Sequence, residues 1–199
     1  MIRKSIGAVG AVAAAVLLLA ACGGDGNDVT TRTVAPGSPG PRPNVGYTNV
    51  PQVDQVLNTA LSRDSIELAR ITGYQRVGCA NEPQAFADGP ICRSPDEPDG
   101  QEVEVFPHSG CQDDWIRPEQ IPDIYRAQFD RDGVQVYAVY TPAGDAVRYG
   151  AEYVAVVTAG DEAAALYIHD GRLVSLEVGC VDVGGLLDDA RVDNFLFQP

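Results

Sequence analysis

The chain has 199 residues, a formal net charge of −14 at pH 7 and a pI of about 4.3. Proteins that bind nucleic acid draw most of their affinity from Lys and Arg side chains that neutralise phosphates, so this charge excludes nucleic acid as an expected partner. An anionic membrane surface repels such a chain too, unless something other than charge holds the protein there.

Residues 1–21 have the layout of an export signal. Arg3 and Lys4 precede a run from residue 6 to residue 21 that contains only Ile, Gly, Ala, Val and Leu. The run is shorter than the ~20 residues that a membrane-spanning helix needs, and a charged start followed by a short apolar run is typical of a secretory signal peptide. The chain has no twin-arginine pair, so we expect export by the general route.

The signal ends in the sequence Leu19-Ala20-Ala21-Cys22. These residues and their flanks resemble the bacterial lipobox. The resemblance implies that the signal is cut before Cys22 and that the Cys22 sulfur carries lipid. Because each buried CH₂ of an acyl chain contributes about 0.8 kcal/mol, two or more chains anchor a protein stably. We therefore expect an extracytoplasmic lipoprotein anchored to the cell membrane; the alternative is an ordinary signal followed by an accidental cysteine.

Residues 22–50 are expected to form a tether. Between residues 23 and 46 there are six glycines, four prolines and no aromatic residue. Such a segment cannot bury enough apolar surface to offset the entropy lost on ordering. The composition predicts a disordered spacer that lifts a domain off the membrane.

Residues 51–199 are expected to form a single domain, long enough to bury an independent core. It contains Cys79, Cys92, Cys111 and Cys180. An even number of cysteines in an exported chain implies disulfides, and four cysteines allow three connectivities. We favour Cys79–Cys92, which closes a short Pro-, Gly- and Asp-rich loop, and Cys111–Cys180, which joins a loop to a strand end. Zinc is the rival interpretation, but no pair has C-x-x-C spacing.

The hydrophobic pattern predicts helices and strands in turn. Apolar residues at helical spacing after Pro51 predict a helix over 51–61, and Asp64 with Glu67 resembles a capping box that starts a second helix, to about residue 71. Strands are expected over 74–79 and 102–106, and a third helix over 121–129 with Pro122 in its first turn.

The remaining residues are predicted to form strands. Short turns separate residues 134–141, 152–158, 163–169 and 172–178, and Asp170-Gly171 fits a type I′ hairpin. Strands joined in this way pair antiparallel, so we expect a four-stranded meander. A short helix and an edge segment are expected within 184–197.

This order of elements is similar to the NTF2-like (cystatin-like) α+β fold, in which helices pack on a curved antiparallel sheet. The segments VGCA, ICRSP, SGCQDDW and EVGC also resemble the cysteine frame of uncharacterised secreted bacterial domains. The second resemblance implies no activity.

His108 is the main candidate for catalysis. Asp113 and Asp114 follow it closely, and a histidine oriented by a carboxylate can act as a general acid or base near neutral pH. Its neighbours are Pro, Ser and Gly, so an exposed loop with an imidazole pKa near 6.5 is the simpler expectation. His169 precedes the hairpin turn and is expected to be a strand end. The chain has no G-x-S-x-G, P-loop or G-x-G-x-x-G motif.

Two acidic stretches are candidate calcium sites. Asp96, Glu97, Asp99 and Glu102 fall within seven residues, and the segment 130–133 carries two further aspartates. Calcium prefers several oxygen ligands, but neither stretch has the full spacing of a calcium-binding loop. Solvated acidic loops are favoured, and no metal or other cofactor is expected.

Four tyrosines, Tyr137, Tyr140, Tyr153 and Tyr167, lie in the predicted strands. They could line a pocket, but packing in the sheet core with the hydroxyl at its edge is the favoured interpretation.

Two classes of function remain open. The first is a non-enzymatic module that binds an extracytoplasmic protein, a cell-wall component or a small apolar ligand. It rests on the anchor, the tether and the missing catalytic motifs. The second is an extracytoplasmic enzyme that uses His108 with Asp113 or Asp114 in an NTF2-like pocket. The sequence favours the first class.

Overall fold

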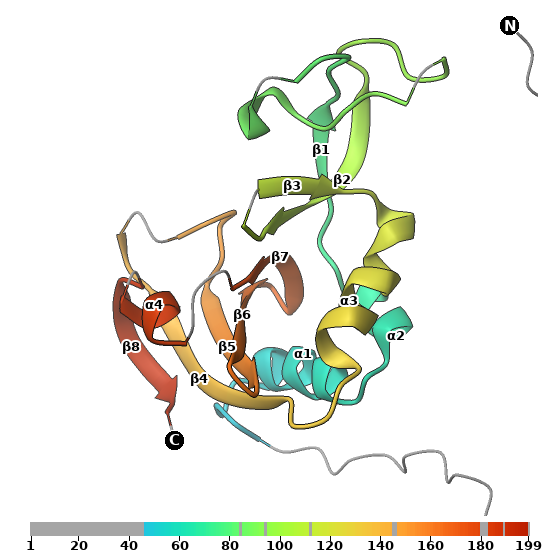
Figure 1. The fold of residues 1–199 in the computed structure, drawn as a ribbon. Coiled ribbons are helices and arrows are strands. Elements are labelled where there is room, and N and C mark those ends of the chain that lie inside the picture. Colours follow the sequence, from blue (N-terminus) through green and yellow to red (C-terminus); the bar gives the residue numbers. More distant parts are fainter. Residues whose placement is uncertain are drawn as a thin grey trace, which may run out of the picture. The chain divides into compact units, whose positions relative to one another are not determined.

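The computed structural model describes residues 46–198 except 84, 94, 112, 145–146, 180–182 and 189. The expected signal, the lipidated Cys22, nearly all of the tether and Cys180 lie outside the described residues. The described residues belong to one unit of the chain, residues 39–199. Its elements are α1 (Pro51–Leu61), α2 (Ser65–Arg70), β1 (Gln75–Gly78), β2 (Glu102–Ser109), β3 (Asp113–Ile116), α3 (Ile121–Phe129), β4 (Gln135–Pro142), β5 (Tyr153–Ala159), β6 (Glu162–His169), β7 (Arg172–Val178), α4 (Val183–Asp188) and β8 (Val192–Phe197), with short 3₁₀ turns at Phe86–Asp88 and Pro118–Gln120 (Figure 1).

The first two helices begin where the sequence predicts. Pro51 opens α1, and Val53 and Val56 on its apolar face are completely buried. The side chain of Asp64 accepts a hydrogen bond from the backbone amide of Glu67 at 2.9 Å, which satisfies one of the free N–H groups at the start of α2. Both helix predictions are confirmed.

The strands form one eight-stranded sheet in the order β1-β2-β7-β6-β5-β4-β8, with β3 paired to β2 beside this path. The predicted meander is confirmed, since β4 to β7 pair antiparallel with their neighbours in sequence. Asp170 and Gly171 have φ values of 47° and 69°, as a type I′ hairpin turn requires. The α+β class is therefore confirmed.

Both faces of the sheet are covered along its central strands. Helices α1, α2 and α3 pack on one face, and α4 packs on the other (Figure 1). Five consecutive residues of β5 and six of β6 are buried, a pattern typical of strands enclosed on both sides. The main cluster includes Leu57, Phe106, Tyr125, Leu166, Ile168 and Leu176.

Two features near His108 were not predicted correctly. Strand β2 continues to Ser109 instead of ending at Phe106, and Asp113–Ile116 forms the additional strand β3. Pro107 has no N–H for a strand ladder, but β7 pairs with β2 only beyond it, at His108 and Ser109. Pairing with a distant strand thus extends β2 through a Pro-, Ser- and Gly-containing segment that local sequence patterns do not predict to be a strand.

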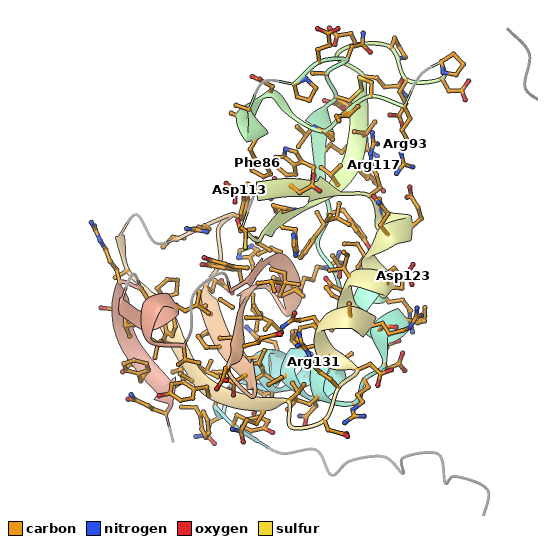
Figure 2. All side chains as sticks on the ribbon, in the orientation of Figure 1. Phe86, Arg93, Asp113, Arg117, Asp123 and Arg131 are labelled. Carbon is orange, nitrogen blue, oxygen red and sulfur yellow. A yellow bond between two sulfur atoms is a disulfide. The ribbon has the colours of Figure 1, made fainter. Side chains whose placement is uncertain are left out.

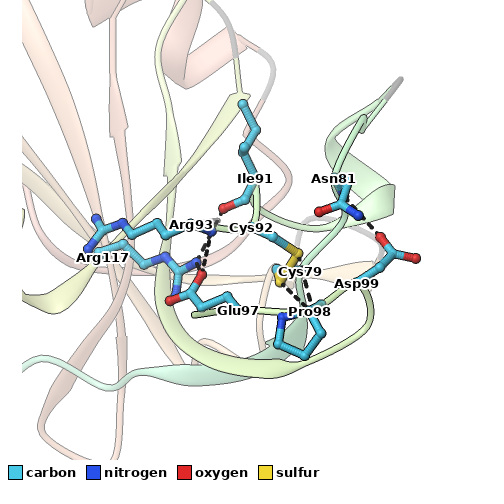
Figure 3. The surroundings of a disulfide bond; sticks show 9 residues. All are labelled: Cys79, Asn81, Ile91, Cys92, Arg93, Glu97, Pro98, Asp99 and Arg117. Carbon is cyan, nitrogen blue, oxygen red and sulfur yellow. Dashed lines mark hydrogen bonds and ion pairs between the residues drawn. A yellow bond between two sulfur atoms is a disulfide. The ribbon is translucent and has the colours of Figure 1, made fainter. Parts of the chain in front are cut away.

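The Cys79–Cys92 disulfide is confirmed (Figure 3). Both cysteines are buried beside Val103 and Val105 of β2. Cys111 is disulfide-bonded as well. Because Cys180 lies outside the described residues, the pairing Cys111–Cys180 stays a prediction.

A buried pair of hydroxyls joins the end of α2 to α3. The hydroxyl of Thr72 lies 2.8 Å from that of Tyr125 and donates a hydrogen bond to the Leu68 carbonyl at 3.0 Å. Since the Thr72 proton is committed to Leu68, Tyr125 is the donor between the two hydroxyls. Burial raises the pKa of Tyr125 far above its ordinary value, so this donor keeps its proton.

We expect Tyr125→Phe to lower the free energy of unfolding by about 1 kcal/mol, the net value of one hydrogen bond. Thr72→Val should cost more, about 2–3 kcal/mol, because it leaves the Tyr125 donor buried without an acceptor. Urea denaturation of both single variants and the double variant measures this. The double variant should be more stable than Thr72→Val alone; strictly additive losses would contradict the assignment.

Candidate functional site

Two hollows in the described part of the chain share Tyr149 as a wall residue. The first hollow has a volume of about 470 Å³ and is lined mainly by Phe86, Ser109, Asp113, Arg148, Tyr149 and Glu177. The second hollow, of about 510 Å³, is lined mainly by Tyr74, Gln75, Tyr149, His169, Asp170 and Arg172. Both volumes fall in the range of small-molecule sites, roughly 300–1,000 Å³.

Strand pairing assembles the floor of the first hollow. The parallel register of β2 and β7 sets Ser109 opposite Glu177, and the antiparallel register of β2 and β3 sets Ser109 opposite Asp113. Polar side chains from three neighbouring strands therefore form one row. Phe86 also lines the hollow, and Figure 2 shows it near Asp113.

A charged network borders this row. Arg148 donates through Nη1 to Glu177 Oε2 at 3.1 Å, and the Tyr167 hydroxyl donates to the same oxygen at 2.8 Å. The Arg148 guanidinium also lies over the Tyr167 ring, 5.8 Å from its centroid. Burial, followed by the charge of Glu177, raises the pKa of Tyr167 and raises the pKa of Tyr140 to about 12. Both phenols therefore keep their protons at physiological pH, and that of Tyr167 is donated to Glu177.

Asp113 is the second carboxylate of the first hollow. Its Oδ1 accepts a hydrogen bond from the Ser109 hydroxyl at 2.6 Å, and its side chain is otherwise exposed. Burial and the charge of Asp113 raise the pKa of Tyr149, while Arg148 opposes this shift. The Tyr149 hydroxyl therefore lies within electrostatic reach of both charges.

Tyr149 has an unfavourable backbone conformation. Its φ is 52°, in the left-handed region, and Gly150 follows with a φ of 72°. For a residue with a large side chain this conformation costs about 1–2 kcal/mol. Backbone strain of this kind is concentrated at functional sites, where it holds a side chain in a required place.

The second hollow lies between the start of β1 and the β6–β7 hairpin. The Tyr74 hydroxyl donates to the Ala69 carbonyl at 3.3 Å, and Gly73 donates its N–H to the Leu173 carbonyl at 2.8 Å. His169 ends β6, as predicted, and also lines this hollow. Aromatic rings and the side chains of Gln75 and Arg172 thus line the second hollow together.

The structure corrects the prediction that His108 lies in an exposed loop. His108 is half-buried within β2, opposite Asp114 of β3 and Leu176 of β7. Burial lowers the pKa of His108, and the charge of Asp114 partly opposes this effect. Burial therefore places the pKa of His108 below the 6.5 expected for an exposed imidazole.

His108 and Asp113 contribute to different faces of the sheet. Successive residues of a strand point to opposite sides, and Ser109 and Asp113 line the first hollow while His108 and Asp114 do not. The Asp114 carboxylate accepts a hydrogen bond from the amide of Trp115 at 2.7 Å. Of the two predicted carboxylate partners, only Asp114 is placed beside His108.

The acidic loop is held by an arginine (Figure 3). Arg117 is only 7% exposed and donates to Glu97 Oε2 at 2.7 Å and to the Ile91 carbonyl at 3.3 Å. Arg93 donates its backbone N–H to Glu97, and this bond holds the pKa of Glu97 below its usual range. Asp99 accepts from the amide of Asn81 at 2.9 Å.

Neither acidic stretch is arranged as a metal site. Asp96 and Glu102 are exposed. In the second stretch, Arg63 forms ion pairs with Asp130 and Asp132 at 3.7 and 2.7 Å. Within the part of the chain that the structure describes, no group of three His, Cys, Asp or Glu side chains could hold a metal ion.

The four predicted tyrosines divide between the two faces. Tyr140 and Tyr167 are buried and Tyr137 half-buried on the face that α4 covers, whereas Tyr153 packs against the main cluster under α1 to α3. None of them lines the two hollows described above. The tyrosines that line the hollows are Tyr74, just before β1, and Tyr149, in the connection between β4 and β5. Neither position lies within the alternating apolar pattern of a strand, so the sequence pattern did not indicate them.

Comparisons with protein families, with curated proteins and with solved structures find no match for this chain. Across the described residues, no helix has both the length and the apolar character needed to cross a membrane.

We expect the stability of the protein to decrease between pH 7 and pH 5 partly because of His108. Its pKa is lowered in the folded state, so the unfolded chain binds the proton more readily, and the free energy of unfolding falls as the pH drops below about 6.5. The variant His108→Gln should show a smaller decrease in urea denaturation across this pH range. An NMR titration that places the His108 pKa at or above 6.5 would refute the expectation.

Proposed function

We propose that the protein is an extracytoplasmic lipoprotein, anchored through Cys22, whose C-terminal domain is a non-enzymatic binding module with its site at the two hollows beside Tyr149. The lipobox-like sequence and the tether support the anchor. The Cys79–Cys92 disulfide fits an oxidising compartment, because such bonds persist outside the cytoplasm.

The strained conformation of Tyr149 carries the proposal for the binding site. A left-handed tyrosine reduces stability, and glycine, which already follows it, would fill the same backbone position without strain. The side chain is kept where it separates two hollows of ligand size. A role of Tyr149 as a wall of a ligand-binding site explains both its strained backbone and its position between the hollows.

The lining favours a polar ligand. Charged or hydrogen-bonding side chains such as Asp113, Arg148, Gln75 and Arg172 face the hollows together with aromatic rings. This argues for a cell-wall component, a polar metabolite or a polar segment of a protein over a small apolar ligand. Nucleic acid stays excluded by the net charge.

The NTF2-like architecture is part of the proposal. Three helices on one face of a mostly antiparallel sheet, with three strands before the third helix and a meander after it, support this assignment. Fold alone carries no activity.

The alternative is an enzyme that uses His108. One observation favours it: His108 is half-buried beside Asp114, with a lowered pKa. Catalysis also needs a cavity next to the imidazole. His108 lines neither hollow, and the carboxylates of the first hollow, Asp113 and Glu177, lie on the other face of the sheet, so binding without catalysis is the better supported function.

Lipid attachment is tested at Cys22. We expect metabolic labelling with a palmitate analogue to mark the wild-type protein and to leave a Cys22→Ala variant unlabelled, because the thioether to the lipid needs this sulfur. Equal labelling of both proteins would disprove the anchor.

The binding site is tested with Tyr149→Gly. Relief of the strain should offset the lost packing and the added chain entropy, so we expect a free energy of unfolding within about 1 kcal/mol of wild type. Native mass spectrometry of the lipoprotein, extracted from membranes in mild detergent, should show a ligand on the wild type that Tyr149→Gly lacks.

Asn49→Gly is the matched control, because Asn49 is another left-handed residue, with a φ of 61°, and does not line either hollow. The control should keep the ligand. Identical spectra for all three proteins would count against a site at Tyr149.

A further inference from the structure

The first hollow presents charges of both signs to the same space. Arg148 and Asp113 both line it, and each has capacity left for a ligand. The side chain of Arg148 is 48% exposed and engages Glu177 through Nη1, whereas a guanidinium carries five N–H donors. Asp113 accepts from Ser109 through Oδ1, whereas a carboxylate has about four acceptor sites.

Ligands of a single charge fit this hollow poorly. An anion at Arg148 meets the carboxylates of Glu177 and Asp113, and the net charge of −14 repels it at long range. A simple cation at Asp113 meets the guanidinium of Arg148. Glu177 Oε2 already accepts hydrogen bonds from Arg148 and from the Tyr167 hydroxyl, whereas Arg148 keeps further N–H donors and Asp113 further acceptor sites. The ligand that best matches the charges of this hollow therefore carries one positive and one negative group.

The aromatic walls suit the body of such a ligand. Phe86 stacks on Trp115 with the ring centroids 4.3 Å apart, and the Trp115 indole N–H donates to the Phe86 carbonyl at 2.9 Å. Both contacts fix Phe86 in place. Tyr149 adds a second ring and a hydroxyl within reach of both charges. Aromatic faces attract an ammonium group and cover short apolar chains.

We infer that the first hollow binds small zwitterions, molecules that carry a free ammonium and a free carboxylate, such as an amino acid or a short peptide. The ammonium lies at Asp113 and the carboxylate at Arg148. This inference rests on the proposed binding function and names its ligand class.

The test uses the processed lipoprotein in mild detergent and the dipeptide alanyl-alanine as the probe, measured by isothermal titration calorimetry at pH 7 and low salt. Low salt is needed because exposed charges are screened strongly. We expect binding of the free dipeptide. The N-acetylated and the C-amidated forms each lack one charge, so each should bind about tenfold more weakly or worse, the loss of one charge-assisted hydrogen bond.

The variants Asp113→Asn and Arg148→Gln should weaken binding of the free dipeptide by a similar factor. Matched controls are Asp123→Asn and Arg126→Gln, an exposed ion pair on α3 whose partners lie 2.6 Å apart and do not line the hollow. The controls should bind as the wild type does. Circular dichroism melting shows whether each variant is folded; if Arg148→Gln is not, Arg148→Lys, which keeps the charge and loses the fork, replaces it.

The outcomes separate this inference from the proposed function. No binding of the free dipeptide at about ten millimolar, or equal binding of the free and capped forms, overturns the zwitterion class. If native mass spectrometry then still shows a ligand that depends on Tyr149, the binding module stands and only its ligand class is wrong. If the dipeptide binds and Tyr149→Gly binds it equally well, the zwitterion site stands and the proposed role of Tyr149 fails.

Discussion

The short parallel pairing of β2 with β7 connects two parts of the fold that are otherwise built locally. Only two register pairs make it, His108 with Leu176 and Ser109 with Glu177. The β4–β7 meander and the β2–β3 hairpin each form between neighbours in the chain, whereas this pairing spans nearly seventy positions and closes a loop that contains α3. The row of polar residues from β7 through β2 to β3 exists only because these strands are adjacent. The first hollow depends on the same contact.

The two faces of the sheet then take different roles. One face is covered by three helices and holds the main apolar cluster, in which Tyr125 is the polar exception and satisfies its hydroxyl with Thr72. The other face is covered by α4 over part of its strands and carries the charged network of Arg148 and Glu177. Because side chains alternate along β2, this division places His108 and Ser109 on different faces. It is the physical basis for preferring binding over catalysis.

Arginine side chains of this acidic domain form ion pairs with carboxylates that lie close to them in the fold. Arg117 joins Glu97 in a nearly buried pair, Arg63 joins Asp130 and Asp132, and Arg148 joins Glu177. The first two pairs involve the carboxylates that suggested calcium sites, so these carboxylates act as arginine partners in the structure. Of these three arginines, Arg148 alone borders the first hollow, which a second carboxylate and two aromatic side chains also line. This difference is the reason for proposing a ligand site at Arg148.

The sequence by itself determined the three helices, the meander, the tight Asp170-Gly171 turn and the Cys79–Cys92 disulfide. Each depends on groups close together in the chain: apolar periodicity, capping and turn residues, or a short loop between cysteines. It did not reveal the end of β2, strand β3, the setting of His108 or the hollows beside Tyr149. Those features depend on which strands become neighbours and on which face each side chain then lies. Contacts between distant segments decide both, and no local pattern records them.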